Sequence, residues 1–487
     1  MQEKERTWVY WLNVVIALSL MVFIRFIPAP EPLTPQGMLV AGLFIGMVYG
    51  WCTTSMIWPS CAALTIFGLS MENTVPAVWS QAWGSPIVIF LIFLMTISAL
   101  LSESGLNGFI TDWVLSRKIT RGRPWVFVLA FMLANMLSSM VIGAIASVIV
   151  FWRITHTICQ KIGYKKGDDL PAYLCFGIVF LGGVGTIALP FQTPVITNFA
   201  VLFAAANGAI TSYDYVAYLL FALPMALLAL LLFVGVGRFI IKPDVEPLKQ
   251  YNPDEYLPAV GGKGMDARQK IGAVVFGLLV VLLLAPSFLK GNTSLVAGYI
   301  LRLGEVGSTA LVLGILGVIL YQKRPFVLIE KLINAGVFWG LIFMLTAAMF
   351  FAGKLTSPDT GITAFLMILL QPLLATVGKA GFIFLLMLAT IVLTNMINNV
   401  AVQAIFIPLA YSICGTLDIN PYVFMVMFIF VVDFAIYLPS ASPLGALMHN
   451  SDGWIAKKQI YKWGLLTLLL ELVLVIVIGY PLGNLVF

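Results

Sequence analysis

The sequence predicts an all-α membrane protein with about 11 transmembrane helices, two re-entrant hairpins and an inverted structural repeat. Three observations lead to this fold class. Hydrophobic residues occupy 61% of the 487 positions and charged residues only 10%, whereas an ordinary soluble domain carries about 25% charged residues. Long apolar runs alternate with short polar loops. Short motifs of the first half recur in the same order in the second half.

The composition excludes several classes of protein. A soluble chain of this size would not bury so much apolar surface, so a cytosolic enzyme, a secreted disulfide scaffold and a disordered chain are ruled out. The net charge of +6 comes from short basic runs between apolar segments and does not indicate a nucleic-acid surface. The five cysteines form no CxxC, and we interpret them as small core residues. We expect no cofactor and no cysteine–histidine metal cluster.

The apolar runs give the expected membrane crossings in chain order. A crossing helix needs about 20 apolar residues, with a range of about 17–25. The first run follows a stretch without a small-residue cleavage site, so we expect a retained helix. Uninterrupted runs lie at 8–28, 36–52, 54–70, 86–104, 215–241, 270–289, 304–321, 333–353 and 463–484. Interrupted runs, with Gly, Pro or small polar residues near the middle, lie at 125–160, 172–206, 381–411 and 420–448.

The basic residues predict the orientation of the chain. With 125–160 and 381–411 as hairpins, and 172–206 and 420–448 as interrupted crossings, the chain crosses eleven times. With the N-terminus inside, 22 of the 27 Lys and Arg residues fall in inside segments and 5 in outside segments, as the positive-inside rule requires. We therefore expect a multi-pass protein of the cell membrane with its N-terminus inside and its C-terminus outside.

The two halves of the sequence resemble each other. Each half holds five crossings and one hairpin, and an odd number of crossings inverts the second copy, as is typical of secondary transporters. The matched motifs are LIFLMT at 91–96 with LIFMLT at 341–346, SGLNGFI at 104–110 with TGITAFL at 360–366, LANMLSS at 133–139 with LTNMINN at 393–399, and LPFQTP at 189–194 with LPSASP at 438–443.

This repeat divides the chain into four predicted parts. We expect an N-terminal transmembrane helix, a first repeat with an inward-opening hairpin at 125–160, a cytoplasmic linker, and a second repeat with an outward-opening hairpin at 381–411. The boundaries of the four parts are 1–35, 36–241, 242–269 and 270–487.

Small polar residues stand where we expect the hairpin tips, at Ser138 and Ser139 and at Asn398 and Asn399. A tip exposes the last carbonyls of one helix and the first N–H groups of the next. Carbonyl and side-chain oxygens suit a hard cation such as Na⁺. The N–H groups at the positive end of the helix dipole suit an anion. The tips are therefore candidate ion sites.

The interrupted crossings complement these tips. Proline removes N–H donors and glycine permits an unwound backbone, so carbonyl groups become available to a cation. A single small residue in a membrane helix more often serves close packing, but clusters at four repeat-equivalent places favour a binding site. The residues in question are Gly182, Gly183, Gly185, Thr186, Pro190, Thr193 and Pro194 in the first crossing, and Pro439, Ser440, Ser442, Pro443 and Gly445 in the second.

Few charged residues approach these segments. Asp433 precedes the second break, and either of two roles is open to it: to carry a proton or favour a cation, or to bond to a neighbouring helix. For Glu471, which lies outside the broken segments, we favour the structural role. No Arg or Lys falls at a tip. An anion would therefore be bound by dipoles, hydroxyls, amides and a co-bound cation.

At these residues the sequence resembles the divalent anion:sodium symporter family, within the wider ion-transporter superfamily. Residues 398–400, followed by Pro408, fall in register with the second hairpin tip of that family. Residues 439–445 fall in register with its break in the tenth crossing, and residues 182–183 resemble its glycine motif in the fifth. The order of elements matches over nearly the whole chain, so the chain is identified as a divergent member.

The resemblance implies a homodimer that couples Na⁺ to the uptake of a small organic anion, a carboxylate. It also implies an elevator movement of a transport domain against a scaffold, with 105–117 and 361–377 as arm helices. One implied cation site consists of Ser138, Ser139, Gly182 and Gly183, and the other of Thr394, Asn399 and the backbone near Ser440. The implied substrate contacts are Ser138, Ser139, Thr193, Pro194, Asn398, Asn399, Ser442 and Pro443.

Departures from the family pattern make the expected site less polar than a typical dicarboxylate site. Met140 and Val400 stand where the family has residues that donate hydrogen bonds. A smaller or more apolar carboxylate, or H⁺ coupling through Asp433, is therefore an alternative. A proton-linked antiporter or exporter of the same superfamily, moving Na⁺, an oxyanion or a monocarboxylate, also remains open.

A membrane-embedded enzyme is the alternative function outside the class of transporters. Such an enzyme needs catalytic acids, histidines or arginines in extramembrane loops, and the outside loops here are short and nearly free of them. We therefore expect no enzyme. The expected partners are a small anion, Na⁺ or H⁺, the lipid bilayer and a second copy of the chain, and no nucleic acid.

Overall fold

The computed structural model describes residues 8–70, 74–106, 109, 121–252, 265–289, 294–321, 323–439 and 441–487. Across these residues the regular structure is helical, apart from one short antiparallel ladder between β1 (Leu320–Tyr321) and β2 (Arg324–Pro325). The described residues contain 11 helices that are long and apolar enough to cross a membrane. The predicted all-α membrane fold is therefore confirmed.

The chain forms two compact units, each built from three separate segments. Unit 1 consists of Met1–Ile89, Ile196–Tyr213 and Phe338–Phe428, and unit 2 of Phe90–Val195, Asp214–Val337 and Ile429–Phe487. Each unit therefore takes segments from both predicted halves of the chain. The predicted repeat remains a prediction, because it concerns the order and direction of the crossings.

Unit 1 contains the N-terminal helices and the second predicted hairpin. Within it α2 packs on α1 and α3, and α16 packs on α3 and α18. Its elements are α1 (Trp8–Phe23), the 3-10 turn η1 (Ile24–Phe26), α2 (Pro35–Thr53), α3 (Ile57–Ser70), α4 (Val75–Trp83), α16 (Trp339–Leu355), the 3-10 turn η5 (Pro358–Thr360), α17 (Ile362–Thr394) and α18 (Asn399–Thr416).

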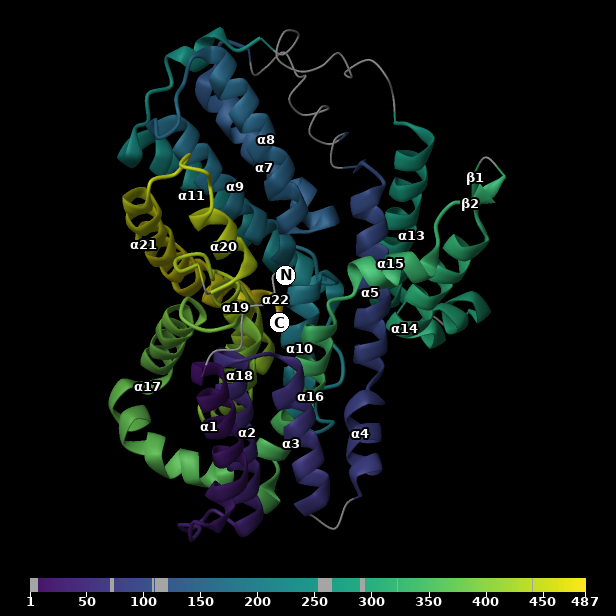
Figure 1. Ribbon diagram of the computed structural model, residues 1–487, viewed down its shortest axis with the longest axis vertical. Coiled ribbons are helices and arrows are strands. Elements are labelled where there is room, and N and C mark those ends of the chain that lie inside the picture. The colour runs from purple at the N-terminus through teal and green to yellow at the C-terminus, as the bar shows by residue number, and fades with distance from the viewer. Residues whose placement is uncertain are drawn as a thin grey trace. The chain divides into compact units, whose positions relative to one another are not determined.

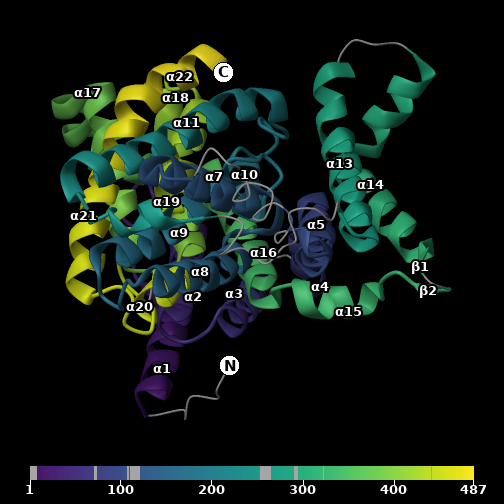
Figure 2. The ribbon, with the colours of Figure 1, turned by 90° about the horizontal axis from the view of Figure 1, so that it is seen from above.

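Unit 2 contains the first predicted hairpin and the interruptions of both interrupted crossings, residues 188–192 and 433–442. Figure 1 shows α7, α8 and α9 side by side, and Figure 2 shows α13 beside α14. The helices are α7 (Pro124–Ile142), α8 (Ala144–Ile162), α9 (Asp169–Ile187), α11 (Tyr215–Val236), α13 (Ala267–Leu289), α14 (Leu295–Val318), α15 (Ile329–Gly336), α20 (Pro443–His449), α21 (Lys457–Leu474) and α22 (Tyr480–Val486). The shorter elements are the π-helices η3 (Gly237–Ile241) and η6 (Val475–Gly479) and the 3-10 turn η4 (Pro247–Gln250).

Three helices pass from one unit to the other along the chain, α5 (Pro86–Glu103), α10 (Thr193–Ala205) and α19 (Pro421–Val432). Many helices in both units begin with a side-chain cap. The Thr34 hydroxyl accepts a hydrogen bond from Gly37 N–H, and Pro35 follows it in the first turn. Asp214 and Ser294 cap α11 and α14 in the same way. Such caps stabilise a helix start by about 1 kcal/mol, and proline fits the first turn because it lacks an N–H group there.

Both predicted breaks are confirmed in position. The first interrupted run divides into α9 and α10, separated by residues 188–192. The second divides into α19 and α20, separated by residues 433–442. Each break contains a proline, Pro190 in the first and Pro439 in the second, as the sequence indicated. The glycines predicted to unwind the backbone lie inside helices instead, Gly182, Gly183 and Gly185 in α9 and Gly445 in α20.

The two hairpins reverse at different distances from the predicted tips. The first reverses at Gly143, whose φ is +85°. Ser138 and Ser139 lie before it in the last turns of α7, so their predicted place at the tip is wrong. The second reverses over residues 395–398, so Asn398 and Asn399 stand at the tip as predicted. Since no membrane accompanies the protein, re-entry from one face stays a prediction.

The number of membrane-length helices agrees with the prediction, but their membership differs. α3 and α19 are shorter than a full crossing, and the predicted crossing 333–353 divides into α15 and α16, which are bent by 70°. In their place α7, Thr376–Thr394 and α18 each reach crossing length. The long α17 bends at Gly378, whose φ is +63° (Figure 1). Length alone therefore does not separate a crossing helix from a hairpin arm.

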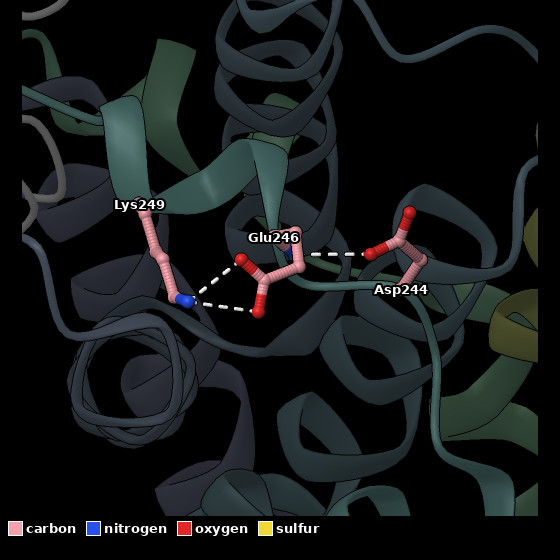
Figure 3. Close-up of polar contacts among 3 residues, drawn as sticks. All are labelled: Asp244, Glu246 and Lys249. Atoms are coloured by element: carbon pink, nitrogen blue, oxygen red, sulfur yellow. Dashed lines mark hydrogen bonds and ion pairs between the residues drawn. The ribbon is translucent and has the colours of Figure 1, made fainter.

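The start of the predicted linker folds onto the first hairpin. Tyr164, in the α8–α9 loop, donates a hydrogen bond to the Asp244 carbonyl at 2.9 Å. Tyr251 is 1% exposed and lies 4.5 Å from the Phe127 ring. Figure 3 shows the Lys249–Glu246 ion pair and the Asp244 carboxylate that accepts from the Glu246 N–H. Residues 253–264 of the linker lie outside the described part of the chain.

Candidate functional site

The first half of the candidate site lies in unit 2, where α7 and α8 run antiparallel. Ser147 on α8 donates to the side-chain oxygen of Asn135 on α7 at 2.9 Å. The rings of Phe131 and Phe151 lie 5.2 Å apart, one turn further from the reversal. Both pairs lie at equal distances in sequence on either side of residue 141, so α7 and α8 pack along their length as the two arms of one hairpin.

The helix α9 packs closely against this hairpin. Asn135 also donates from its amide nitrogen to the Ile178 carbonyl of α9 at 2.9 Å. A Cβ atom at Gly185 would lie 2.5 Å from the Met136 carbonyl oxygen, so only glycine fits this approach. The glycines of α9 thus bring its backbone against the last turns of α7.

Ser139 lies at this contact with its hydroxyl group unsatisfied. The side chain is fully buried, and its Oγ has no hydrogen-bond partner among the described residues. A Cβ atom at Gly182 would lie 3.4 Å from this Oγ. Buried hydroxyl groups are normally hydrogen-bonded. The missing partner indicates a place for a ligand that an oxygen atom can coordinate.

The first break closes over the end of α7. Gln192 is 9% exposed, and its side-chain amide donates to the Met140 carbonyl. The Thr186 hydroxyl donates to the Gly183 carbonyl at 2.6 Å, next to the start of the break. Gln192 was not among the predicted site residues. A buried amide inside a broken helix is the sequence signal that would have found it.

The second break is held by Ser442. Its hydroxyl donates to the Ala435 carbonyl and accepts from the Gly445 N–H at 3.1 Å, so it caps α20. A Cβ atom at Gly183 would lie 3.7 Å from Leu444 of the same helix, so α20 lies against the glycine segment of α9. The Ser442 hydroxyl therefore has a structural role at the break. Ser440, predicted to contribute backbone, lies outside the described residues.

Asp433 stands at the start of this break, where α19 ends. It lies close enough to Tyr218 of α11 to interact with it electrostatically. Tyr218 in turn donates from its hydroxyl to the Ile187 carbonyl, the last residue of α9, at 2.7 Å. The two breaks are thus connected within unit 2 through α11.

The second tip lies in unit 1 and carries amide groups. The Thr394 hydroxyl donates to the side-chain oxygen of Asn399 at 3.0 Å. Asn398 caps α18, because its side-chain oxygen accepts from the Val400 N–H at 2.9 Å. One turn later, Gln403 is 1% exposed, and its side-chain oxygen has no partner among the described residues. Gln403 is a second polar residue that the sequence reading did not select.

The predicted residues therefore form two groups. Ser138, Ser139, Gly182, Gly183, Thr193, Pro194, Asp433, Ser442 and Pro443 belong to unit 2, and Thr394, Asn398 and Asn399 belong to unit 1. Both groups offer hydroxyl, amide and carbonyl oxygens. The described residues hold no group of three His, Cys, Asp or Glu side chains that would bind a transition metal. Oxygen atoms of these kinds are the ligands that hard cations take in proteins.

A separate cavity in unit 1 contains a positive charge. It measures about 320 Å³ and is lined by Lys354 together with the neutral polar residues Gln81, Ser85 and Asn207. The Lys354 ammonium group lies 5.5 Å from the centre of the Phe350 ring and 5.8 Å from that of Phe67. These aromatic contacts position the lysine side chain at the cavity.

The sequence matches a known family over most of its length. A model of the citrate transporter family matches residues 38–429. An uncharacterised transporter of Methanocaldococcus jannaschii, MJ0672, is 22% identical over 348 residues, which cover 70% of the chain and 70% of that protein. The sodium-dependent dicarboxylate transporter SdcS of Staphylococcus saprophyticus is 20% identical over 488 aligned positions, which cover 96% of the chain and 90% of that protein.

Two solved structures share the fold. The YdaH transporter of Alcanivorax borkumensis superposes with a TM-score of 0.58 at 14% identity, covering 92% of the chain and 98% of that structure. MtrF of Neisseria gonorrhoeae, described with a class of antimetabolite efflux pumps, superposes with a TM-score of 0.56 at 14% identity. This second match covers 97% of the chain and 94% of that structure. At such low identity the likeness concerns the fold alone.

Proposed function

We propose a function from one premise: this chain belongs to the citrate transporter family, whose model matches most of its length. It is a secondary transporter and an integral multi-pass membrane protein, not an enzyme. From this premise we infer that it performs Na⁺-coupled symport of a small organic anion, a carboxylate.

One observation carries the proposal of a cation site. The Ser139 hydroxyl is fully buried beside Gly182 and has no partner among the described residues. A buried hydroxyl left without a hydrogen bond costs about 1–3 kcal/mol. A bound Na⁺ would remove that cost, because its ligands are oxygen atoms. The name of SdcS, a sodium-dependent dicarboxylate transporter aligned over nearly the whole chain, supports the same ion.

Two cation sites are proposed on this basis. The first uses Ser138, Ser139 and the backbone of Gly182 and Gly183. The second uses Thr394 and Asn399 with the backbone near Ser440. In the structure, Thr394 and Asn399 already meet at 3.0 Å through their side-chain oxygens. Two oxygens held this closely offer adjacent ligands for one cation.

The substrate is proposed to contact the same hairpins and breaks. The contacts would be uncharged, so a carboxylate would be held by N–H groups, amides, hydroxyls and the neighbouring Na⁺. Met140 and Val400 add apolar surface, which favours a small or partly apolar carboxylate. The proposed contact residues are Ser138, Ser139, Thr193, Pro194, Asn398, Asn399, Ser442 and Pro443.

The remaining features follow the family and are proposals as well. We infer an elevator movement, a homodimer, and insertion in the cell membrane with the N-terminus inside and the C-terminus outside. The predicted inverted repeat, with an inward-opening and an outward-opening hairpin, would fit the elevator movement, because such repeats exchange conformations to give alternating access.

The test of Na⁺ binding uses thermal unfolding of purified protein in NaCl and in KCl of equal concentration. We expect the wild type to be more stable in NaCl, since a ligand that binds only the folded state stabilises it. The Ser139→Ala variant should lose this Na⁺ effect and keep its stability in KCl, because the removed hydroxyl has no partner. Ser147→Ala is the matched control: it should lose stability in both salts and keep the Na⁺ effect.

Uptake into liposomes tests the substrate. A panel of mono-, di- and tricarboxylates and oxyanions is offered with an inward Na⁺ gradient, and uptake of one carboxylate should require Na⁺. If uptake follows a pH gradient and ignores Na⁺, the proton-linked antiporter replaces the symporter. Unchanged Na⁺-driven uptake in both Ser139→Ala and Asn399→Ala would instead refute the assigned residues.

A further inference from the structure

A carboxyl group lies buried in unit 2, outside the hairpins and the breaks. Glu471, on α21, is 2% exposed. Its Oε1 has no hydrogen-bond partner among the described residues. Burial of a carboxyl group without a partner is rare in folded proteins, and an ionisable residue in a membrane helix is a functional candidate. The structural role that the sequence favours for Glu471 would require a hydrogen bond to a neighbouring helix, and Oε1 makes none with the described residues.

Glu471 lines a small, almost entirely apolar cavity between α9, α11 and α21. The cavity measures about 10 Å³, which is near the lower limit for one water molecule. It therefore has no room for an organic ligand. Its other lining residues are Phe180, Ala229, Leu232, Phe233, Val236, Thr467, Leu470 and Leu474.

Among the described residues, no cationic group lines this cavity. The Thr467 hydroxyl, the other polar group of the lining, donates to backbone carbonyls of its own helix at 2.9 Å. Of the titratable groups on the packed helices, Tyr173 on α9 donates to the Phe233 carbonyl and Tyr218 on α11 to the Ile187 carbonyl.

The charged groups nearest along the chain also lie outside the lining. Arg238, on η3 beyond Val236, is exposed and lies 5.5 Å from the Phe239 ring. Lys462 on α21 is more than two turns from Glu471, Asp433 at the break interacts with Tyr218, and His449 on α20 lies 3.0 Å from the Tyr437 carbonyl.

These surroundings decide the charge of Glu471. An ionised carboxylate needs water, hydrogen-bond donors or a cation to compensate for its desolvation. The described residues that line the cavity supply no cation, and the one hydroxyl among them donates to its own helix, while the volume admits at most about one water molecule. The neutral, protonated form is therefore the favoured one, and the ligand that the site holds is a proton.

Two π-helices lie directly beyond the cavity. Val236 ends α11 at the cavity wall, and the π-helix η3 follows it. Leu474 ends α21 at the same cavity, and the π-helix η6 follows it. Short π segments are rare and occur often at functional sites, because their backbone hydrogen bonds can shift register. The backbone hydrogen bonds that follow α11 and α21, the two helices beside Glu471, can therefore shift register.

Phe180 connects the cavity with the candidate ion site. It lines the Glu471 cavity from α9, two residues before Gly182. Its ring also packs at 4.9 Å from that of Phe434, next to Asp433 in the second break. A displacement of α9 or of the break therefore moves a wall of the Glu471 cavity.

We propose that Glu471 is a proton-binding site of this transporter, neutral in the present conformation and able to exchange its proton when movement of α9 or α11 admits water to the cavity. The proposal concerns the chain's own carboxyl group and does not depend on which anion or cation is transported.

Infrared spectroscopy of the purified protein tests the protonation state directly. The wild type at neutral pH should show the C=O band of a protonated carboxyl group, and this band should be absent from Glu471→Gln. Gln has nearly the same shape and no charge, so the variant should keep the thermal unfolding midpoint of the wild type. Glu471→Leu, which removes the buried polar group altogether, is a second folded variant that should lack the band.

A carbodiimide provides an independent chemical test. Dicyclohexylcarbodiimide reacts with a protonated carboxyl group: the carboxyl proton moves to a carbodiimide nitrogen, the carboxyl oxygen bonds to the central carbon, and the acyl group then migrates to nitrogen, so no atom is lost. The closed cavity has no room for this reagent, so labelling requires the movement of α9 or α11 that opens it. Peptide mass spectrometry should find the adduct at Glu471, and labelling should fall as pH rises. Glu246, which is exposed and ion-paired with Lys249 (Figure 3), is the internal control and should stay unlabelled.

The role in transport is tested by the pH profile of uptake. Glu471→Gln should take up substrate with a flattened pH dependence, because a Gln side chain neither binds nor releases a proton. A carboxylate band in place of the protonated band would overturn the proposal, and so would a wild-type pH profile in Glu471→Gln. The infrared and carbodiimide readouts need neither substrate nor Na⁺, so they stand even if the proposed symport fails.

Discussion

At the residue scale, three glycines of α9 lie within four positions of each other and differ in what a side chain at each position would contact. Gly185 allows the Met136 carbonyl to approach and leaves no room for a methyl group. An added Cβ at Gly182 would meet the Ser139 hydroxyl at ordinary contact distance, and one at Gly183 would meet Leu444. Gly182 is therefore the position of the three where a methyl group would reach the candidate cation site without forcing the backbone apart.

Gly182→Ala should weaken Na⁺ binding without unfolding the protein. The added methyl group would sit 3.4 Å from Ser139 Oγ and fill the space beside it. Alanine also favours a helix over glycine by about 1 kcal/mol, so the stability in KCl should not fall. We expect the Na⁺ concentration for half-maximal thermal stabilisation to rise about tenfold, or ~1.4 kcal/mol. Gly277→Ala, at a helical glycine of α13 where an added methyl group meets nothing within 4 Å, is the control, and an equal rise in both variants would contradict the assignment.

Individual residues at the two hairpin tips show where the sequence-based prediction was wrong. Ser138 and Ser139 were placed at a tip, but the apolar residues that follow them continue α7 to Ile142, and Gly143 ends it. Gly143 was the better signal, because a glycine with positive φ can end a helix where other residues are strained. Asn398, a cap residue by type, was placed correctly. Gln192 acts through its bond to the Met140 carbonyl, which lies 52 positions earlier in the sequence and belongs to no local pattern.

At the element scale, equivalent asparagines of the two hairpins have different partners. Asn135 joins α7 to both α8 and α9, through Ser147 and the Ile178 carbonyl. Asn395 donates to the Ile391 carbonyl of its own helix at 2.8 Å. The matched motifs LANMLSS and LTNMINN thus stand on a helix interior in one hairpin and at a helix end in the other. Motif similarity predicted the position of both hairpins, but not their packing.

Asn135→Ala should destabilise the protein more than Asn395→Ala. It leaves the Ile178 carbonyl and the Ser147 hydroxyl without one partner each in a buried place, and each loss costs about 1–3 kcal/mol. The bond from Asn395 to the Ile391 carbonyl is local to one helix, and its loss in Asn395→Ala costs about 1 kcal/mol. Thermal unfolding midpoints in detergent measure the difference. A larger fall of the midpoint for Asn395→Ala would mean that the contact of Asn135 with α8 and α9 contributes less to stability than the Asn395 side chain at the second hairpin tip.

The contact between the first hairpin and the linker should weaken in alkaline solution. Burial raises the pKa of Tyr164 above its usual value, and the nearby Asp244 carboxylate adds to the shift. Burial raises the pKa of Tyr251 as well. A raised folded-state pKa means that the folded protein holds the phenol proton more tightly. The stabilisation is therefore complete below the unfolded pKa, about 10, and is lost as pH rises above it.

A pH series of thermal unfolding checks this expectation. The wild type should lose stability above about pH 10, and the double variant Tyr164→Phe with Tyr251→Phe should lose less over the same range. The double variant should start lower at neutral pH, because Tyr164 no longer bonds to the Asp244 carbonyl. Parallel curves for the two proteins would show that other groups cause the alkaline loss.

At the scale of the whole molecule, composition and apolar run lengths were sufficient for the fold class. The crossings and breaks followed from about 20-residue apolar runs interrupted by Pro and Gly. The composition of the two units did not follow, because each unit is assembled from three segments that are far apart in the sequence. Long-range packing of apolar faces decides that assembly, and nearly every face of these helices is apolar.

The orientation of the chain predicts the labelling of a native cysteine. Among the free cysteines, Cys52 is exposed, at the end of α2, whereas Cys159, Cys175 and Cys414 are buried. With the N-terminus inside, the end of α2 faces the cytoplasm. A membrane-permeant maleimide should label Cys52 in intact cells, and an impermeant maleimide should label it only after lysis.

A second position controls this experiment. Asp359 lies in an exposed turn that the same orientation places outside. In a Cys52→Ser background, Asp359→Cys should react with both reagents in intact cells. The reverse pattern at the two positions would invert the proposed orientation of the chain.

The interleaving of the two units has a consequence for biosynthesis. Unit 1 begins at the N-terminus but is completed only by residues up to Phe428, and unit 2 is completed only by the last segment, which ends at Phe487. The ribosome must therefore make most of the chain before either unit closes. Early helices such as α2 leave the translocon long before α16 and α18 exist to cover them. During synthesis these helices depend on lipid or on insertion factors to shield surfaces that later become protein interior.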